Sequence, residues 1–112
     1  MNPTVEEMSA HVMEICAARR IIVAWCDRPG RAIAMLDLWA IRIPPIRSVI
    51  TYAAAMHEIG HLLGQYQQTE FVMVAEQWAW VWARNNALIW TDRMEGFAGV
   101  ALDSYRPPDA SI

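Results

Sequence analysis

Residues 48–64 read SVITYAAAMHEIGHLLG, and this stretch decides how the rest of the chain is interpreted. Ser48 is a suitable N-cap residue, because its side-chain oxygen can accept a hydrogen bond from the first turn of a helix. Gly64 stands where a left-handed C-terminal cap is expected. The stretch therefore predicts a helix over 49–63.

The pattern HExxH falls inside this helix, at His57, Glu58 and His61. Because the two histidines are four residues apart, they lie on one face of the helix, and both imidazoles can bind the same Zn²⁺. Glu58 projects from the adjacent position, where it can reach a water molecule on that ion. It would act as general base on the water and then pass the proton to the leaving amine. The sequence therefore predicts one zinc ion per chain.

A hydrolytic zinc site needs a third protein ligand and one open position. Glu76 is the favoured third ligand, because it stands in an apolar helical stretch where an unpaired carboxylate is costly and a nearby cation compensates it. Its alternative partner is a buried arginine such as Arg42 or Arg84. The other candidate ligands are His11, which falls on the predicted first helix, and Glu70, whose position at a helix start also suits the helix dipole.

This arrangement resembles the active site of the gluzincin metallopeptidases. The similarity covers residues 41–87 and rests on HEIGHLLG at 57–64, followed by Glu76, Ala79 and Ala83. In those families a glutamate helix reads Glu-x-x-Ala-x-x-x-Ala, and its Glu is the third zinc ligand. Among gluzincins the chain is most similar to the small ImmA/IrrE-type peptidases of phages and mobile elements, and to minimal gluzincins of about this length.

A short strand is predicted before the HExxH helix, because apolar and polar side chains alternate in residues 38–43. The pair Pro44-Pro45 ends it, and since neither proline can donate to a ladder, an edge strand is expected. The resemblance implies the same, because gluzincins bind an extended substrate along an exposed strand edge upstream of the active-site helix. Trp39, Ile41 and Ile43 are therefore the predicted substrate-binding residues.

The resemblance also implies a side chain that stabilises the oxyanion. Tyr66 and Tyr105 are the candidates, since each lies on or near a predicted loop. Tyr52 is less suitable, because it stands off the helix face that carries the two histidines. Ordinary packing of an amphipathic ring is the alternative for each tyrosine.

The remaining pattern predicts an α+β fold, in which a mainly helical, zincin-like domain carries a small sheet of two or three strands. An N-terminal helix is expected over 4–25, with Thr4 as its N-cap. A buried helix that carries Glu76 is expected over 69–90. The tryptophans of this helix are predicted to build the core: Trp78, Trp80, Trp82 and Trp90.

A last short helix is expected over 93–102, interrupted by its glycines. It completes a single domain of residues 1–102, and residues 103–112 form a tail with two adjacent prolines. Two prolines favour an extended chain. One hypothesis is that the tail lies along the strand edge of its own or another copy, which would hold the enzyme latent and let copies associate. The alternative is a frayed, solvated chain end.

The composition predicts a folded, cytoplasmic protein. Of the 112 residues 55% are hydrophobic and 19% are charged, which is too apolar for disorder. A net charge of −3 does not supply the basic surface of a nucleic-acid binder. No stretch offers the roughly 20 uncharged apolar residues of a membrane span. Cys16 and Cys26 are predicted to be reduced, buried thiols.

The sequence favours an enzyme, namely a zinc metallopeptidase that hydrolyses bonds of a peptide or protein substrate. One alternative is a zinc-containing regulatory or binding module of a phage or mobile element, without turnover. Another is a helical interaction domain without a metal. Glu58 favours catalysis, because a purely structural zinc site does not need it.

Overall fold

The computed structural model describes residues 1–105, and these form four helices and one small sheet. The predicted α+β single domain is confirmed. From residue 106 onward the predicted tail lies outside the described residues, and so does its expected contact with a strand edge. The elements, in chain order, are α1 (Val5–Arg19), β1 (Ile22–Trp25), the 3₁₀ turn η1 (Pro29–Arg31), β2 (Ile33–Met35), β3 (Ala40–Ile43), α2 (Val49–Leu63), α3 (Val72–Asn86) and α4 (Asp92–Asp103).

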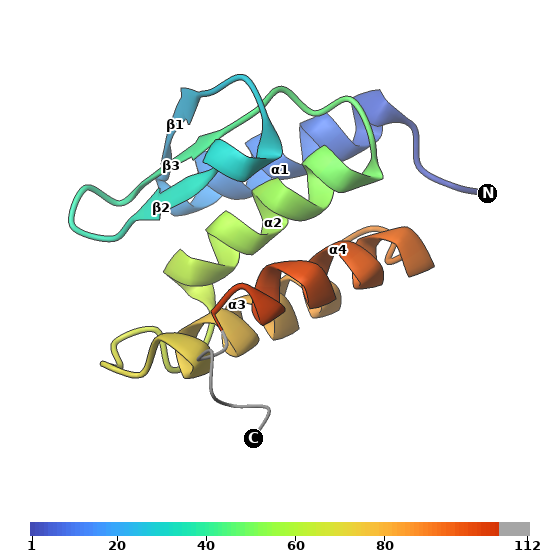
Figure 1. The fold of residues 1–112 in the computed structure, drawn as a ribbon. Coiled ribbons are helices and arrows are strands. Elements are labelled where there is room, and N and C mark those ends of the chain that lie inside the picture. Colours follow the sequence, from blue (N-terminus) through green and yellow to red (C-terminus); the bar gives the residue numbers. More distant parts are fainter. Residues whose placement is uncertain (106–112) are drawn as a thin grey trace.

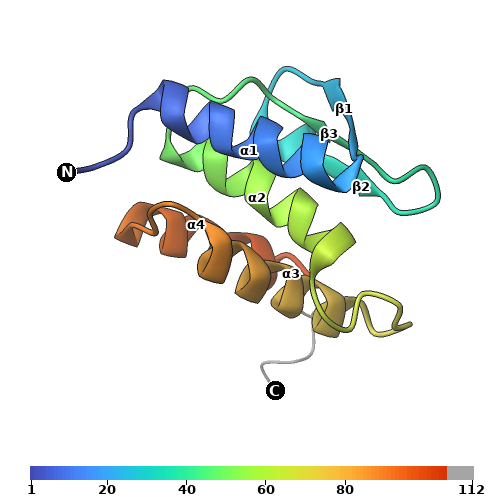
Figure 2. The ribbon, with the colours of Figure 1, turned by 180° about the vertical axis from the view of Figure 1, so that it is seen from behind.

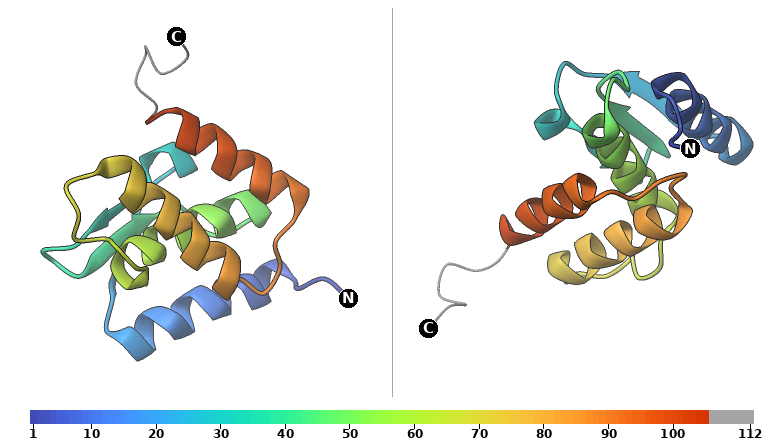
Figure 3. Two further views of the ribbon diagram at one scale, coloured as in Figure 1. Left: turned by 90° about the horizontal axis from the view of Figure 1, so that it is seen from below. Right: turned by 90° about the vertical axis from the view of Figure 1, so that its right-hand side faces the viewer.

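The central element of the fold is α2. In Figure 1 it runs between the sheet with α1 on one side and α3 with α4 on the other. Seen from behind, in Figure 2, the order of these layers is the same. Ten residues of α2 are buried, so this helix carries the middle of the core. Figure 3 shows α3 and α4 next to each other on the face of α2 that points away from the sheet.

The first helix is shorter than predicted. It begins after Thr4, whose hydroxyl accepts a hydrogen bond from the backbone of Glu7 while the Glu7 carboxylate accepts one from the backbone of Thr4. It ends at Arg19, and Arg20 takes a left-handed conformation with φ of 58°. The expected helical segment over 22–25 is instead strand β1. Its β-branched residues fit helical spacing in the sequence, but pairing with β3 decides their conformation.

The predicted edge strand is wrong, because β3 is the middle strand of the sheet. It pairs with β1 in parallel, from Ile22 opposite Ala40 to Trp25 opposite Ile43, and with β2 in an antiparallel direction. The adjacent prolines follow the last residue of β3, so they remove no N–H group from its ladder. The edge strands of the sheet are β1 on one side and β2 on the other.

The predicted substrate residues of this strand have other roles. Ile41 and Ile43 are completely buried and belong to the core, as the alternating pattern predicts, but this leaves them no access to a substrate. Trp39 precedes the strand, in a turn with φ of 52°. Its indole N–H donates to the carbonyl of Arg19 over 2.9 Å, which ties the turn to the end of α1.

The predicted caps of α2 are partly confirmed. The Ser48 hydroxyl accepts a hydrogen bond from the backbone N–H of Thr51 at the start of the helix. Gly64 ends the helix, but with φ of −74° rather than in the left-handed region. A Cβ atom at Gly64 would lie 2.5 Å from the carbonyl oxygen of Gly60 and 3.2 Å from that of Trp78. Contact with the carbonyl oxygens of α2 and α3, and not backbone handedness, is therefore what requires glycine here.

The helices on the far side of α2 differ from their predicted extents. α3 runs over Val72–Asn86, and it buries one face, formed by Glu76, Ala79, Trp80 and Ala83. Its other tryptophan positions, Trp78 and Trp82, are half-buried. α4 runs over Asp92–Asp103 without interruption, because its two glycines face open space and the helix hydrogen bonds continue through them.

Neither cysteine of the described chain is in a disulfide. Cys16 is buried in α1 and Cys26, after β1, is half-buried. Burial raises the pKa of the Cys16 thiol to about 11, which keeps it protonated and unreactive near neutral pH. Within residues 1–105, none of the helices is both long and apolar enough to serve as a membrane span.

The closest approach of two elements is that of α2 and α3 at Gly60. A Cβ atom at this position would overlap the carbonyl oxygen of Ala79 and would lie 3.1 Å from the Ala79 Cα. The obstructing atoms belong to the backbone of α3, so they cannot move aside as a flexible side chain would. By contrast, a Cβ atom at Gly96, in the middle of α4, meets nothing within 4 Å.

The same substitution should therefore have opposite effects at these two helix positions. Gly60→Ala should lower the free energy of unfolding by about 1–3 kcal/mol, because the two helices must separate. Gly96→Ala should raise it by up to about 1 kcal/mol, because alanine is the better helix former and nothing obstructs its methyl group. Urea unfolding followed by circular dichroism measures both. Equal effects of the two variants would contradict the close contact at Gly60.

Candidate metal centre

Three residues that the sequence singled out as metal ligands meet between α2 and α3. His57 and His61 project from α2, one turn apart, and Glu76 projects from the facing side of α3. The Nε2 atom of His57 lies 3.4 Å from Oε2 of Glu76, and Nε2 of His61 contacts the same oxygen. One potential ligand atom from each residue lies within 4.8 Å of the others. These three residues could hold a metal ion.

The polar atoms of this cluster are poorly satisfied by protein groups. Glu76 is only 4% exposed and His57 only 8%. Nε2 of His57 and Oε2 of Glu76 are buried and have no hydrogen-bond partner among the described residues. Such atoms cost free energy unless something else binds them. In a tetrahedral zinc site with bonds of about 2.0–2.1 Å, two ligand atoms stand roughly 3.3 Å apart. The separation between His57 and Glu76 matches this spacing, so these two donor atoms fit such an ion.

The protonation of the cluster follows from its burial and charges. Burial alone lowers the pKa of His57, but close contacts with Glu58 and Glu76 and the charges of these carboxylates outweigh it and raise the pKa to about 9. Burial alone raises the pKa of Glu76, but its contacts with His57 and His61 outweigh it and hold the pKa well below its usual range. Glu76 is thus a carboxylate near neutral pH, which is the form that binds a cation.

Glu58 lies beside the ligands without belonging to them. It is 7% exposed, and its Oε2 lies 3.2 Å from Nδ1 of His57. A carboxylate can only accept at this distance, so Nδ1 of His57 carries a hydrogen. With a pKa of about 9, the metal-free ring carries a second hydrogen on Nε2, which a metal ion would displace. Glu58 also lines both hollows that flank the cluster. Glu58 can therefore reach a small molecule at the candidate metal site.

Two hollows meet at the cluster, and together they form a cleft. Both are lined by Ala32, His57, Glu58, Glu76 and Tyr105. One hollow, of about 270 Å³, continues between η1, α2 and α4. The other, of about 290 Å³, follows the free edge of β2 and includes His61. The metal-binding residues thus lie in the middle of an open groove and not in a closed core site.

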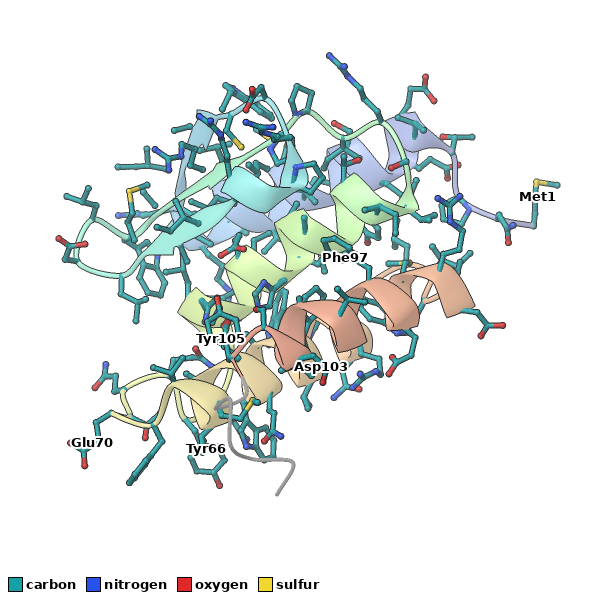
Figure 4. The ribbon with its side chains drawn as sticks, in the orientation of Figure 1. Met1, Tyr66, Glu70, Phe97, Asp103 and Tyr105 are labelled. Atoms are coloured by element: carbon teal, nitrogen blue, oxygen red, sulfur yellow. The ribbon has the colours of Figure 1, made fainter. Side chains whose placement is uncertain are left out.

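Of the two tyrosines predicted near the oxyanion, the structure brings only Tyr105 to the cleft. Partial burial, a hydrogen bond with Glu76 and the charges of Glu76 and Glu58 raise the pKa of Tyr105 to about 12. Tyr66 is 60% exposed, and its ring packs edge-on against Trp78 at 4.9 Å between centroids. Figure 4 shows Tyr105 near the end of α2, whereas Tyr66 points away from the molecule. Tyr66 and Trp39 line a separate hollow, and His57, His61 and Glu76 are not part of its walls.

The other candidate ligands lie elsewhere. Glu70 is exposed in the loop before α3 and points outward in Figure 4. Nδ1 of His11 lies 2.6 Å from the hydroxyl of Tyr52, which also accepts a hydrogen bond from the backbone N–H of Leu88. Tyr52 is fully buried, so this network joins α1 and α2 to the chain after α3. Arg84, an alternative partner for Glu76, binds Glu95 instead, over 3.0 Å.

Two residues with no predicted role in the site touch its histidines. Trp80 stacks on His57, with ring centroids 4.0 Å apart and planes 10° from parallel. Gln67 places its side-chain oxygen 2.9 Å from Nδ1 of His61. Trp80 lies four residues after Glu76, one helical turn away, and this spacing was the available signal. For Gln67, in a polar loop, the sequence held no such signal.

None of the family models, curated proteins or solved structures compared with the chain matches it.

The ligand assignment predicts different effects for two glutamates. Glu76→Gln should weaken Zn²⁺ binding by more than about 100-fold, because it removes the only carboxylate of the donor set, whereas loss of an outer hydrogen bond alone costs about 10- to 100-fold. Glu70→Gln, at an exposed position of the preceding loop, should leave the affinity unchanged. Competition with a chromophoric chelator measures both. Tight binding by Glu76→Gln together with weak binding by Glu70→Gln would reverse the assignment.

Proposed function

We propose that the protein is a zinc-dependent metallopeptidase. The observation that carries the proposal is the convergence of His57, His61 and Glu76, in which Nε2 of His57 and Oε2 of Glu76 are buried without hydrogen-bond partners among the described residues. Two imidazoles and one carboxylate are the ligands of hydrolytic zinc sites, which keep a fourth position open. The open groove around this set supports a catalytic rather than a structural site.

When bound, zinc supplies a Lewis acid that polarises the scissile carbonyl group and lowers the pKa of a water molecule. Glu58 accepts a proton from the attacking water and delivers it to the leaving amine. Its carboxylate is held against Nδ1 of His57, which fixes its direction, and it lines both arms of the groove. Tyr105 stays protonated because of its raised pKa, so its hydroxyl can donate a hydrogen bond to the developing oxyanion.

The free edge of β2 supports an extended peptide as the substrate. Among the described strands β2 pairs with β3 alone, so its other edge presents backbone groups that can bind an added strand. Ile33 and Ala34 of β2 line the same hollow as the metal-binding residues. A peptide added to this edge therefore passes in front of His57 and His61. The edge of β2 therefore takes the substrate-binding role that the sequence analysis assigned to β3.

The lining of the groove favours apolar segments of such a substrate. Apart from the metal-binding residues and Glu58, no charged side chain among the described residues lines either hollow. The walls of the hollow near α4 are apolar, and Phe97 and Val100 belong to them. A charged substrate side chain would lose water there without gaining a partner. We therefore expect cleavage next to apolar residues.

The proposed general base can be tested without loss of the metal site. Glu58→Gln should bind zinc as the unaltered protein does, because Glu58 is not a ligand, but kcat/KM for peptide hydrolysis should fall by about 10²- to 10⁴-fold. Zinc content by mass spectrometry and cleavage of a proteome-derived peptide mixture are the two measurements.

The outcome separates the catalytic proposal from its alternative, a zinc-containing module without turnover. Glu70→Gln is the matched control and should keep full activity. A zinc-loaded unaltered protein that cleaves nothing in the mixture would favour the binding module. Full activity of Glu58→Gln would remove the mechanism.

The apolar lining also predicts a change of specificity on substitution at the rim. Val100 is 74% exposed, so Val100→Arg should fold normally while placing a cation at the hollow. It should raise the relative kcat/KM for peptides with an acidic residue next to the cleaved bond by roughly two- to fivefold, since an exposed ion pair contributes up to about 1 kcal/mol. Leu38→Arg, which is exposed and outside the groove, should leave the cleavage profile unchanged. An unchanged profile in Val100→Arg would show that substrates do not enter this hollow.

A further inference from the structure

The side-chain amide of Gln67 connects the two helices that carry the metal-binding residues. Gln67 lies in the loop between α2 and α3. Its Nε2 donates to the carbonyl oxygen of Ala75 over 2.8 Å and to that of Gln65 over 3.1 Å. Its Oε1 lies 2.9 Å from Nδ1 of His61. One amide thus contacts two helices. On α2 it contacts the candidate ligand His61, and on α3 it contacts Ala75, which directly precedes the candidate ligand Glu76.

The direction of this amide follows from its partners. Both groups that contact Nε2 are carbonyl oxygens, which only accept hydrogen bonds, so the nitrogen end of the amide must face them. The oxygen end then faces His61. An amide oxygen is an acceptor only, and the hydrogen between the two residues therefore belongs to Nδ1 of His61. The reversed amide would leave its oxygen against two carbonyl oxygens.

The consequence concerns the other nitrogen of the same ring. In a neutral imidazole one nitrogen carries the hydrogen and the other offers a lone pair. With the hydrogen on Nδ1, the lone pair is on Nε2, which faces Glu76 at the candidate metal centre, so the neutral ring needs a cation between Nε2 and the carboxylate. Only this tautomer can bind a cation in that direction.

We propose that Gln67 is a positioning residue that holds His61 in the tautomer competent for metal binding and fixes the start of α3 beside it. The inference deepens the proposed zinc site and rests on it for the effect on zinc affinity. In its neutral, metal-binding form His57 directs the hydrogen on Nδ1 to Glu58, which the proposed mechanism uses as a base. A neutral amide at His61 performs this task without adding a third carboxylate to a site that already holds Glu58 and Glu76.

Three variants of the full chain separate the functions of the amide. Gln67→Met has a similar length but neither accepts from His61 nor donates to the carbonyl groups. Gln67→Glu keeps the acceptor and loses both donors. Gln68→Met is the matched control, because Gln68 is an exposed glutamine of the same loop.

The first measurement is the tautomer of His61, by ¹H–¹⁵N correlation of the histidine ring nitrogens at a pH where the ring is neutral. It is made on zinc-free protein that also carries Glu76→Ala, because the Glu76 carboxylate would otherwise draw the hydrogen to Nε2. In this background the chains with Gln67, Gln67→Glu and Gln68→Met should show the hydrogen on Nδ1, and Gln67→Met should show a mixture. Circular dichroism verifies that each variant is folded, and Gln67→Glu provides the test if Gln67→Met does not fold.

The second measurement is zinc affinity by chelator competition. Gln67→Met should bind about 10- to 100-fold more weakly than the unaltered protein, as expected for loss of an outer partner of a metal ligand. Gln68→Met should bind with unchanged affinity. Recovery of the tautomer in Gln67→Glu is an effect that a merely structural role of the loop would not produce.

The inference is overturned if, in the Glu76→Ala background, His61 carries its hydrogen on Nε2 while Gln67 is intact, or if Gln67→Met changes neither tautomer nor affinity. It is also overturned if Gln67→Glu shows the same tautomer mixture as Gln67→Met. If the unaltered protein binds no zinc, yet Gln67→Met removes the Nδ1 hydrogen in the Glu76→Ala background, the proposed function is contradicted and the role of Gln67 is supported.

Discussion

The fold depends on the contact between α2 and α3 at Gly60, where two helix backbones meet with no side chain between them. Gly60 directly precedes His61, and its partner Ala79 follows Glu76 by three residues, so the contact lies beside the metal-binding residues on both helices. Metal–ligand distances tolerate only about 0.2 Å. A side chain at position 60 would move α3 by more than that. The glycine of the HEIGH sequence is therefore as much part of the site as its histidines are.

The parts of the fold that local signals determine could be predicted from the sequence. The cap at Ser48, the helical spacing of His57 and His61, and the cost of burying Glu76 among apolar residues all follow from neighbouring positions along the chain. The three metal-binding residues were accordingly identified before the structure was known. Glu76 was found by physical argument, since an isolated carboxylate in an apolar helix needs a partner.

The parts that failed depend on contacts between distant segments. The residues of β1 fit a helical stripe in the sequence, and only their pairing with β3, some eighteen positions later, makes them a strand. That pairing also turns the predicted edge strand into the middle one and leaves β1 and β2 as the edge strands. The two tyrosines, Tyr66 and Tyr105, were equivalent in the sequence, because nothing local says which loop folds back over the groove.

The polar cluster has a cost for stability that its neighbours only partly offset. His57 gains a stacked indole from Trp80, but its Nε2 atom and Oε2 of Glu76 stay unsatisfied among the described residues. Apolar side chains of similar size would pack at such a junction at lower cost. A cation that binds the folded chain would stabilise it, because the unfolded chain does not hold ligands from two helices together. The ion would join α2 and α3 beside the contact at Gly60, so metal binding and the packing of these helices reinforce each other.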